Sequence, residues 1–141
     1  KLSPNAPNLV EIGRAVAAAG ADALTAVNTL GPGMLIDVRA RRPVLANQVG
    51  GVSGPALFPI ALRCVCELAS AVDLPIIGTG GVASGADALA MVMAGATAVG
   101  LGSALYAEGV TVFGRILAEL QALMDEEGIA DLAMVRGCVH V

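Results

Sequence analysis

The residues of this chain best suited to chemistry lie in two glycine-rich turns, each of which follows a short apolar run. The first is PIIGTGGV at residues 75–82, where two isoleucines lead directly into the glycines. The second is AVGLGS at residues 98–103. Glycine lets backbone N–H groups approach an anion without a Cβ in the way, and a hydroxyl group adds a donor. The two turns therefore predict a phosphate site built from Gly80, Gly81, Gly102 and Ser103.

Two further segments place polar or flexible residues where a ligand could be held. The apolar run ALTAV at residues 23–27 ends in Asn28 and Thr29, and GGVSGP at residues 50–55 leads straight into an expected helix. Polar groups at the carboxyl ends of strands hold ligands in barrel enzymes, and amide-rich loops at helix starts contact anions. Both segments are candidate cofactor or substrate contacts.

The elements that must position these residues alternate along the chain. The patterns of apolar residues, glycine and proline first predict a strand end at 1–4, a helix capped by Asn8 and closed at Gly20, and a strand at 23–27. A loop with a short hairpin at 30–47 and a glycine-rich loop at 50–55 are expected next, followed by a helix at 56–72 and a strand at 75–79 buried on both faces. The last elements expected are a helix from its Ser84 cap to Ala94, a strand ending at Leu101 and a helix at 110–126. In the last helix we expect five buried side chains: Phe113, Ile116, Leu117, Leu120 and Met124.

This order predicts an α/β protein with parallel strands. Serial βα units form either an open doubly wound sheet or a barrel. Phosphate turns after the last two strands favour the second half of a (β/α)8 TIM barrel. Because the chain opens on KLSP without an initiator methionine, we expect residues 1–141 to be the C-terminal part of one barrel domain whose N-terminal half is absent.

Composition narrows the function classes. Apolar residues make up 56% of the chain and there are 18 glycines, which suits helices packed closely on a parallel sheet. The net charge is -4, so nucleic-acid binding is not expected. No run reaches the roughly 18 apolar residues of a membrane span, and we expect a cytoplasmic protein. Cys64, Cys66 and Cys138 have the spacing of neither a metal cluster nor a redox pair.

Five segments, in this order and spacing, carry a family resemblance: KLSPN at 1–5, VNTL at 27–30, NQVGGVSGP at 47–55, IIGTGGV at 76–82 and GATAVGLGS at 95–103. Together they resemble the C-terminal half of class 1 dihydroorotate dehydrogenase, and within that class the 1B catalytic subunit. The resemblance implies an FMN-dependent barrel that oxidises dihydroorotate to orotate in pyrimidine biosynthesis. It also implies a homodimer and a partner subunit that carries FAD and a 2Fe-2S cluster and passes electrons to NAD.

The resemblance assigns roles to single residues. FMN contacts would come from Lys1, Val27, Gly54, Gly80, Gly81, Gly102 and Ser103, and substrate contacts from Asn28 and Thr29. The Lys1 charge would stabilise the reduced flavin near N1 and the C2 carbonyl. The family's catalytic base is a Cys or Ser on a loop upstream of this sequence, so we expect no catalytic residue in this chain and no activity from it alone.

Other functions are compatible with the same motifs. A class 1A, fumarate-linked dihydroorotate dehydrogenase and a dihydropyrimidine dehydrogenase domain share much of the pattern. A non-redox isomerase or lyase could use the two turns for a sugar phosphate, but it has no obvious task for Lys1 and Asn28. A non-catalytic half-barrel that pairs with itself would cover an otherwise open sheet edge.

Overall fold

A three-stranded parallel sheet forms the centre of the computed structural model, which describes residues 1–140. Its strands are β1 (Leu24–Ala26), β6 (Ile76–Thr79) and β7 (Ala98–Gly100), in the order β1-β6-β7. Leu2 extends the sheet through an isolated parallel bridge to Ala26. Because parallel neighbours need a crossover connection, each pair of strands is joined through a helix. The predicted α/β class with parallel strands is confirmed, and the arrangement is consistent with part of a barrel.

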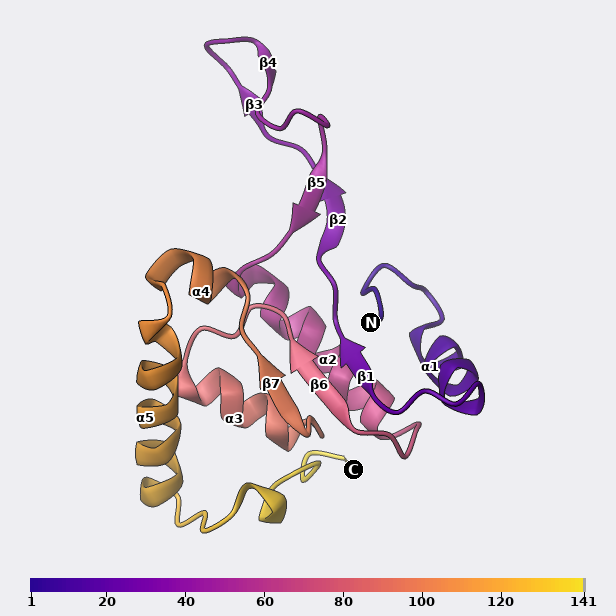
Figure 1. Ribbon diagram of the computed structural model, residues 1–141, viewed down its shortest axis with the longest axis vertical. Helices are drawn as coiled ribbons and strands as arrows, with labels where there is room; N and C mark the ends of the chain where they lie inside the picture. Colours follow the sequence, from indigo (N-terminus) through magenta and orange to yellow (C-terminus); the bar gives the residue numbers. More distant parts are fainter. Residues whose placement is uncertain (141) are drawn as a thin grey trace.

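The helices cover one face of this sheet. In Figure 1, α2 (Phe58–Ala69) and α3 (Gly85–Met93) lie behind the strands, with α1 (Leu9–Ala18) and α5 (Thr111–Glu126) at their flanks. Side chains alternate between the two faces of a strand. In β6, Ile76 faces the helices and is buried, whereas Ile77 faces the other way and is 39% exposed. The expectation that this strand is buried on both faces is therefore wrong for the residues that the structure describes.

The core lies between the sheet and the helices. Its largest fully buried side chains come mostly from strands and helices: Leu24, Leu68, Ile76, Met91, Val65, Val82 and Val112. Burying such a side chain contributes about 1.5–3 kcal/mol. Small residues let the helices approach closely, since a Cβ on Gly13 would lie 2.5 Å from the Cδ2 atom of Leu68. The glycine-rich composition thus serves helix packing as well as turns.

The predicted helix starts differ in how they are capped. Ser84 accepts a hydrogen bond from the Asp87 backbone N–H at 3.1 Å, which confirms it as the cap of α3. Asn8 occupies the cap position of α1, but its side chain donates to Oε2 of Glu11 at 3.3 Å instead of accepting a backbone bond. The position was predicted correctly and the capping bond was not.

Helix α5 matches its predicted range, but not its predicted buried face. Ile116 and Met124 are buried as expected, together with Val112. Phe113 is 45% exposed and Leu117 64% exposed, so their expected burial is wrong. Both line an apolar cavity beside β7 that no other described element fills.

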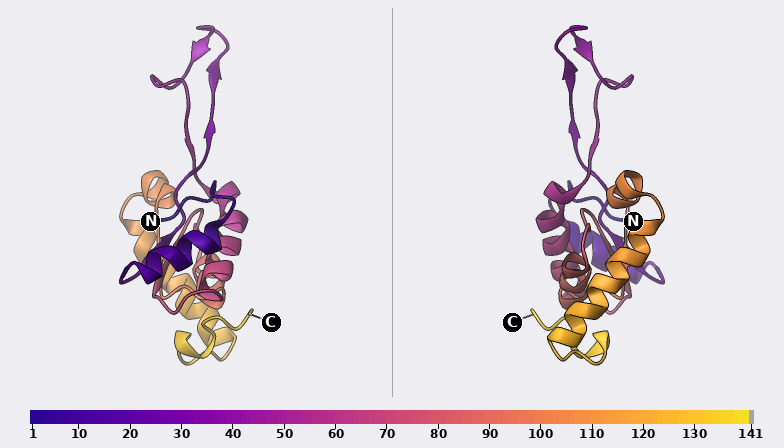
Figure 2. Two further views of the ribbon diagram at one scale, coloured as in Figure 1. Left: turned by 90° about the vertical axis from the view of Figure 1, so that its right-hand side faces the viewer. Right: turned by 90° about the vertical axis from the view of Figure 1, so that its left-hand side faces the viewer.

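A long two-stranded ribbon, residues 30–52, projects away from the body (Figure 1, Figure 2). At its base β2 (Leu30–Gly33) pairs antiparallel with β5 (Gly50–Val52), and at its tip β3 (Ile36–Asp37) pairs with β4 (Arg42–Pro43). The short hairpin expected within 30–47 is present. However, the segment Gly50–Val52, expected as part of a loop, is a strand.

The structure contains three further short helices. They are η1 (Pro55–Leu57), which precedes α2, α4 (Ser103–Glu108) and η2 (Leu132–Met134). Of these, η1 falls at the start of the helix predicted at 56–72, and the other two were not predicted. After η2 the chain folds back onto the end of α3, where His140 Nε2 lies 3.0 Å from the carbonyl oxygen of Ala94. None of the helices in residues 1–140 is both long and apolar enough to cross a membrane.

Candidate functional site

A cleft of about 120 Å³ opens where the three parallel strands end. Its lining comes from separate parts of the chain: Lys1, Val27, Asn28, Thr29, Ser53, Leu57, Thr79, Gly80, Gly81, Gly102 and Ser103. All the predicted site residues except Gly54 are therefore brought together. The carboxyl ends of parallel strands meet at one edge of a sheet, which is why residues so far apart in sequence converge.

Backbone hydrogen bonds fix the first wall of this cleft. The N–H of Asn28 donates to the carbonyl of Leu2 at 2.8 Å, and the N–H of Val27 donates to the carbonyl of Thr79 at 2.8 Å. The N–H of Leu2 in turn donates to the carbonyl of Thr25 at 2.8 Å. Lys1 is thereby held next to the end of β1 rather than leading away from it.

A side-chain bond joins the two glycine-rich turns. Thr79 Oγ1 donates to the carbonyl oxygen of Gly100 at 3.0 Å, across the pair β6 and β7. The hydroxyl lies just before Gly80 in one turn, and the carbonyl lies shortly before Gly102 in the other. The strand ends that carry the predicted phosphate residues are thus tied together beside the cleft.

The glycines of the first turn are required by the fold. Gly80 has a φ of 131° and Gly81 a φ of 76°, values that L side chains rarely adopt. A Cβ on Gly80 would also lie 2.7 Å from the Cβ of Ala61 on α2. These two glycines form a tight turn that exposes backbone toward the cleft.

Gly102, in the second turn, has no such packing reason. Its φ is -125°, and a Cβ built on it would meet no atom of residues 1–140 within 4 Å. The space next to this backbone is open, as it must be if a ligand is to lie against it. The structure therefore passes a simple test of fit for a phosphate-bearing group at this position.

Helix α4 adds amide donors at the same place. It begins at Ser103, with Gly102 as its cap residue, and both line the cleft. The first N–H groups of a helix have no carbonyl partner within it, and the helix start favours negative charge. Among the described residues that line the cleft, Lys1 is the one charged side chain. Amides, hydroxyls and one cation together suit an anionic ligand.

A second cleft, of about 260 Å³, adjoins the first at the base of the ribbon and shares Asn28 and Thr29 with it. Asn5 stands on its wall and makes a reciprocal pair with Gly31, donating to the carbonyl and accepting from the N–H at 3.2 Å. This clamp fixes the ribbon base to the N-terminal loop. Sequence reasoning missed it, because the partners are 26 residues apart and no local pattern signals the bond.

The cysteines lie away from both clefts. Cys64 is buried in α2, Cys66 is partly buried two residues on, and Cys138 is exposed near the C-terminal end of the described chain. Burial raises the pKa of the Cys64 thiol and keeps it protonated. None of the three cysteines lines either cleft within the described residues.

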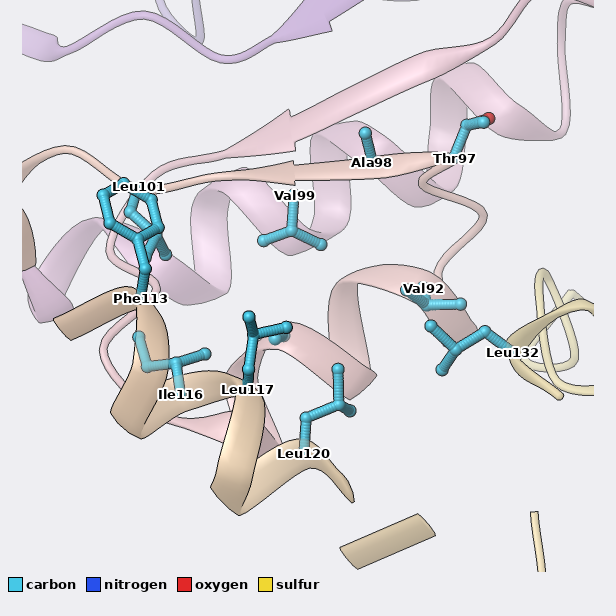
Figure 3. Close-up of a pocket in the computed structure, with 11 residues that line it drawn as sticks. Val92, Thr97, Ala98, Val99, Leu101, Phe113, Ile116, Leu117, Leu120 and Leu132 are labelled. Atoms are coloured by element: carbon cyan, nitrogen blue, oxygen red, sulfur yellow. The ribbon is translucent and has the colours of Figure 1, made fainter. Parts of the chain in front are cut away.

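An apolar cavity of about 250 Å³ lies beside β7 (Figure 3). Val99, Phe113 and Leu117 point toward this space from the strand and from α5, and Leu132 of η2 closes one end. Thr97 supplies the only side-chain hydroxyl of the described lining. Such a lining offers packing area rather than groups for chemistry, so we assign no reaction to it.

Comparison with known proteins identifies the family. The profile of the dihydroorotate dehydrogenase family matches residues 1–124. The chain is 46% identical over 140 residues to the dihydroorotate dehydrogenase B (NAD(+)) catalytic subunit of Methanothermobacter thermautotrophicus, covering 99% of this chain and 46% of the relative. It is 50% identical over 141 residues to the protein of the same name from Geobacter sulfurreducens, covering 100% of this chain and 46% of the relative.

The chain corresponds to only part of each relative. A third relative with that name, from a Geobacillus species, is 49% identical over 137 residues, or 43% of its length. The chain spans about half the length of the curated relatives it matches. With its motifs, its strand-end cleft and the match of the family profile over most of its length, the chain belongs to the dihydroorotate dehydrogenase family.

Proposed function

We propose that the protein containing this chain oxidises (S)-dihydroorotate to orotate, with FMN as cofactor, in the de novo synthesis of pyrimidine nucleotides (UMP). The observation that carries the proposal is the convergence of Lys1, Asn28 and the two glycine turns on one cleft at the ends of the parallel strands. Family membership supports the same reading. A sugar-phosphate isomerase would use the turns but has no clear role for Lys1 beside Asn28.

Different groups of cleft residues would contact different parts of the cofactor. Gly80, Gly81, Gly102 and Ser103 would hold the phosphate through backbone N–H groups and one hydroxyl. The main chain of Val27, which lines the cleft, would contact the flavin, and Gly54 would support the cleft from behind Gly81. FMN, when bound, supplies a two-electron acceptor for hydride. Lys1 would place a positive charge where negative charge develops on the reduced ring.

Asn28 and Thr29 are placed to orient the substrate. They line both clefts, so a molecule in the second cleft could stack beside a cofactor in the first while contacting both side chains. An amide and a hydroxyl suit the carboxylate and ring carbonyls of a planar pyrimidine. We place the base that removes the proton outside residues 1–141, as the resemblance implies.

The finer fold assignment is a closed (β/α)8 barrel, with this chain as its second half. Three observations support it. Ile77 is exposed on the face of the sheet opposite the helices, β7 pairs with β6 only among the described strands, and the apolar cavity lies next to β7. Further βα units would cover Ile77, pair with the outer edge of β7 and cover the cavity.

The proposed partners are a second copy of the protein and an electron-transfer subunit that carries FAD and a 2Fe-2S cluster and reduces NAD. The names of the relatives describe catalytic subunits and NAD(+). The ribbon supports association, since it carries a series of exposed apolar side chains: Met34, Leu35, Ile36, Val38, Val44, Leu45, Val49 and Val52. Exposed apolar area of this kind marks interaction surfaces. We assign the ribbon to the contact with the second copy.

The test uses the full-length protein that contains this chain, with Lys1→Ala and Lys1→Arg variants. FMN binding is measured by titration, and the absorbance of bound flavin is followed anaerobically after dihydroorotate is added. We expect the wild type to bind FMN and bleach, Lys1→Ala to bind but reduce far more slowly, and Lys1→Arg to recover part of the rate. A wild type that binds a sugar phosphate but no flavin would refute the proposal.

A further inference from the structure

Arg115 on α5 occupies the centre of a polar network outside the cleft. Its Nε and Nη2 donate to both carboxylate oxygens of Glu108 at 2.9 and 2.8 Å, and its Nη1 donates to Glu119 at 2.6 Å. Its Nη2 also donates to the carbonyl of Ala83 at 3.1 Å. A guanidinium group holds such partners in a fixed fork geometry, which an ammonium group cannot do.

The partners of Arg115 belong to the two segments that form the predicted phosphate site. Ala83 lies two residues after Gly81, in the connection between β6 and α3. Glu108 is the last residue of α4, the helix that begins at Ser103 in the cleft. One side chain therefore spans from the segment of the first glycine turn to the helix of the second.

Glu119 strengthens the link to the first segment. Its second oxygen accepts from the backbone N–H of Gly85 at 2.8 Å, at the start of α3. This bond, followed by the ion pair with Arg115, holds the pKa of the Glu119 carboxyl below its usual range, so the group is charged at neutral pH. Close packing supports the same contact, because a Cβ on Gly85 would clash with the backbone nitrogen of Leu120.

We propose that Arg115 is a positioning residue for the phosphate site, setting the distance between the Gly80–Gly81 turn and the Gly102–Ser103 turn through Ala83, Glu119 and Glu108. The inference rests on the proposed FMN function. The ion pairs are partly exposed, with side-chain exposures of 38% for Arg115 and 42% for Glu108. Pairs of this kind contribute little to global stability. These ion pairs act locally on the geometry of the site, because a site whose supporting residues are loosened loses affinity for its ligand even when the protein remains folded.

The chain offers a matched control in Arg63. It forms the same kind of exposed pair, with Glu67 one helical turn away at 2.6 Å, and it contacts neither turn of the site. Removing Arg63 therefore deletes a surface ion pair without touching the network around α4. Any effect specific to Arg115 must exceed the effect of that deletion.

The experiment compares FMN with riboflavin, which lacks the phosphate, on the full-length protein and its variants. Dissociation constants are measured by quenching of flavin fluorescence for wild type, Arg115→Ala, Arg115→Lys, Glu108→Gln and Arg63→Ala. We expect Arg115→Ala to weaken FMN binding about tenfold while riboflavin binding changes less than about twofold. Arg115→Lys and Glu108→Gln, which disturb fewer bonds, should fall in between, and Arg63→Ala should match the wild type.

Each result decides the inference. Equal weakening of FMN and riboflavin in Arg115→Ala would mean general loosening and would overturn it, as would an unchanged FMN constant. If Arg115→Ala does not fold, Glu108→Gln decides by the same comparison of the two ligands. If the wild type binds FMN no better than riboflavin, the phosphate site and this inference both fall. If the wild type discriminates and the Arg115 and Glu108 variants discriminate equally well, the inference alone falls.

Discussion

The carbonyl oxygen of Gly54 packs directly behind Gly81, so closely that a Cβ built on Gly81 would lie 2.7 Å from it. The same Cβ would lie 2.7 Å from the backbone nitrogen of Phe58 at the start of α2. The loop that leaves the ribbon and the first glycine turn therefore share a contact that admits no side chain. This explains why Gly54 supports the cleft without lining it.

Replacing Gly81 by alanine should damage both the fold and the site. The φ of 76° disfavours a side chain, and the contacts at 2.7 Å force the backbone to move. Together these effects should lower the free energy of unfolding by about 3 kcal/mol. The control is Gly128→Ala, which has a φ of 67° but open space around it, and should cost about 1 kcal/mol. Urea unfolding of the full-length protein measures both, and equal losses would contradict the packing argument.

Gly102→Ala should separate binding from stability. A Cβ at this position meets no atom of the described chain within 4 Å, so the free energy of unfolding should change by less than about 0.5 kcal/mol. If the open space receives the phosphate of FMN, the added methyl group should weaken FMN binding severalfold in a calorimetric titration. Gly114→Ala on α5 also has open space around it but lies outside the cleft, and should leave FMN binding unchanged. Unaltered FMN affinity in Gly102→Ala would count against the predicted phosphate position.

The stability contributed by Glu119 should depend on pH in a defined direction. Its pKa is lowered in the folded protein, first by the Gly85 N–H and then by Arg115. A lowered pKa stabilises the fold above the ordinary carboxyl value of about 4.3 and loses this effect as pH falls through the folded value. The stability advantage of wild type over Glu119→Gln should therefore be present at neutral pH and be lost in acid, as pH falls below the ordinary carboxyl value and through the lowered folded value. The control is Glu126→Gln, an exposed position on the same helix, and an advantage that persists in acid would refute the assignment.

The exposed apolar side chains of the ribbon lead to a prediction about self-association of the full-length protein. Val38 is 80% exposed and Leu35 68% exposed near its tip. Replacing both by glutamate should weaken self-association of the full-length protein by at least about tenfold, because two charges would have to be buried in an apolar contact. Analytical ultracentrifugation over a range of concentrations measures this. Substitution of exposed Val110, which lies outside the ribbon, serves as control, and unchanged association of the ribbon variant would locate the interface elsewhere.

The elements predicted correctly are those whose signals are local. The Ser84 cap, the apolar spacing of α5 and the β-branched run of β6 each lie within one element, and the structure contains all three elements. The site residues could be predicted to converge because parallel strands end at one edge of a sheet. Topology alone supplies that information.

What the sequence did not reveal depends on contacts between distant segments. The pairing of LGPG with GGV in the ribbon lacks the alternation and β-branched residues that mark strands, and it joins residues about twenty positions apart. Helix α4 has only six residues and lies between Gly102 and Gly109, so no periodicity can show it. The network around Arg115 joins the first glycine turn's connection to α3, helix α4 and helix α5, three segments that no local pattern connects. The error at Phe113 and Leu117 has another cause, since periodicity gives the apolar face but not what covers it.

The way the ribbon joins the body links assembly to the site. Its two strands leave the body through Thr29 on one side and Ser53 on the other, and both residues line the cleft. A partner that holds the ribbon in one orientation would therefore also fix two walls of the cleft. Binding energies coupled in this way are reciprocal: a ligand that prefers the fixed cleft strengthens the association by the same factor as the association strengthens the ligand.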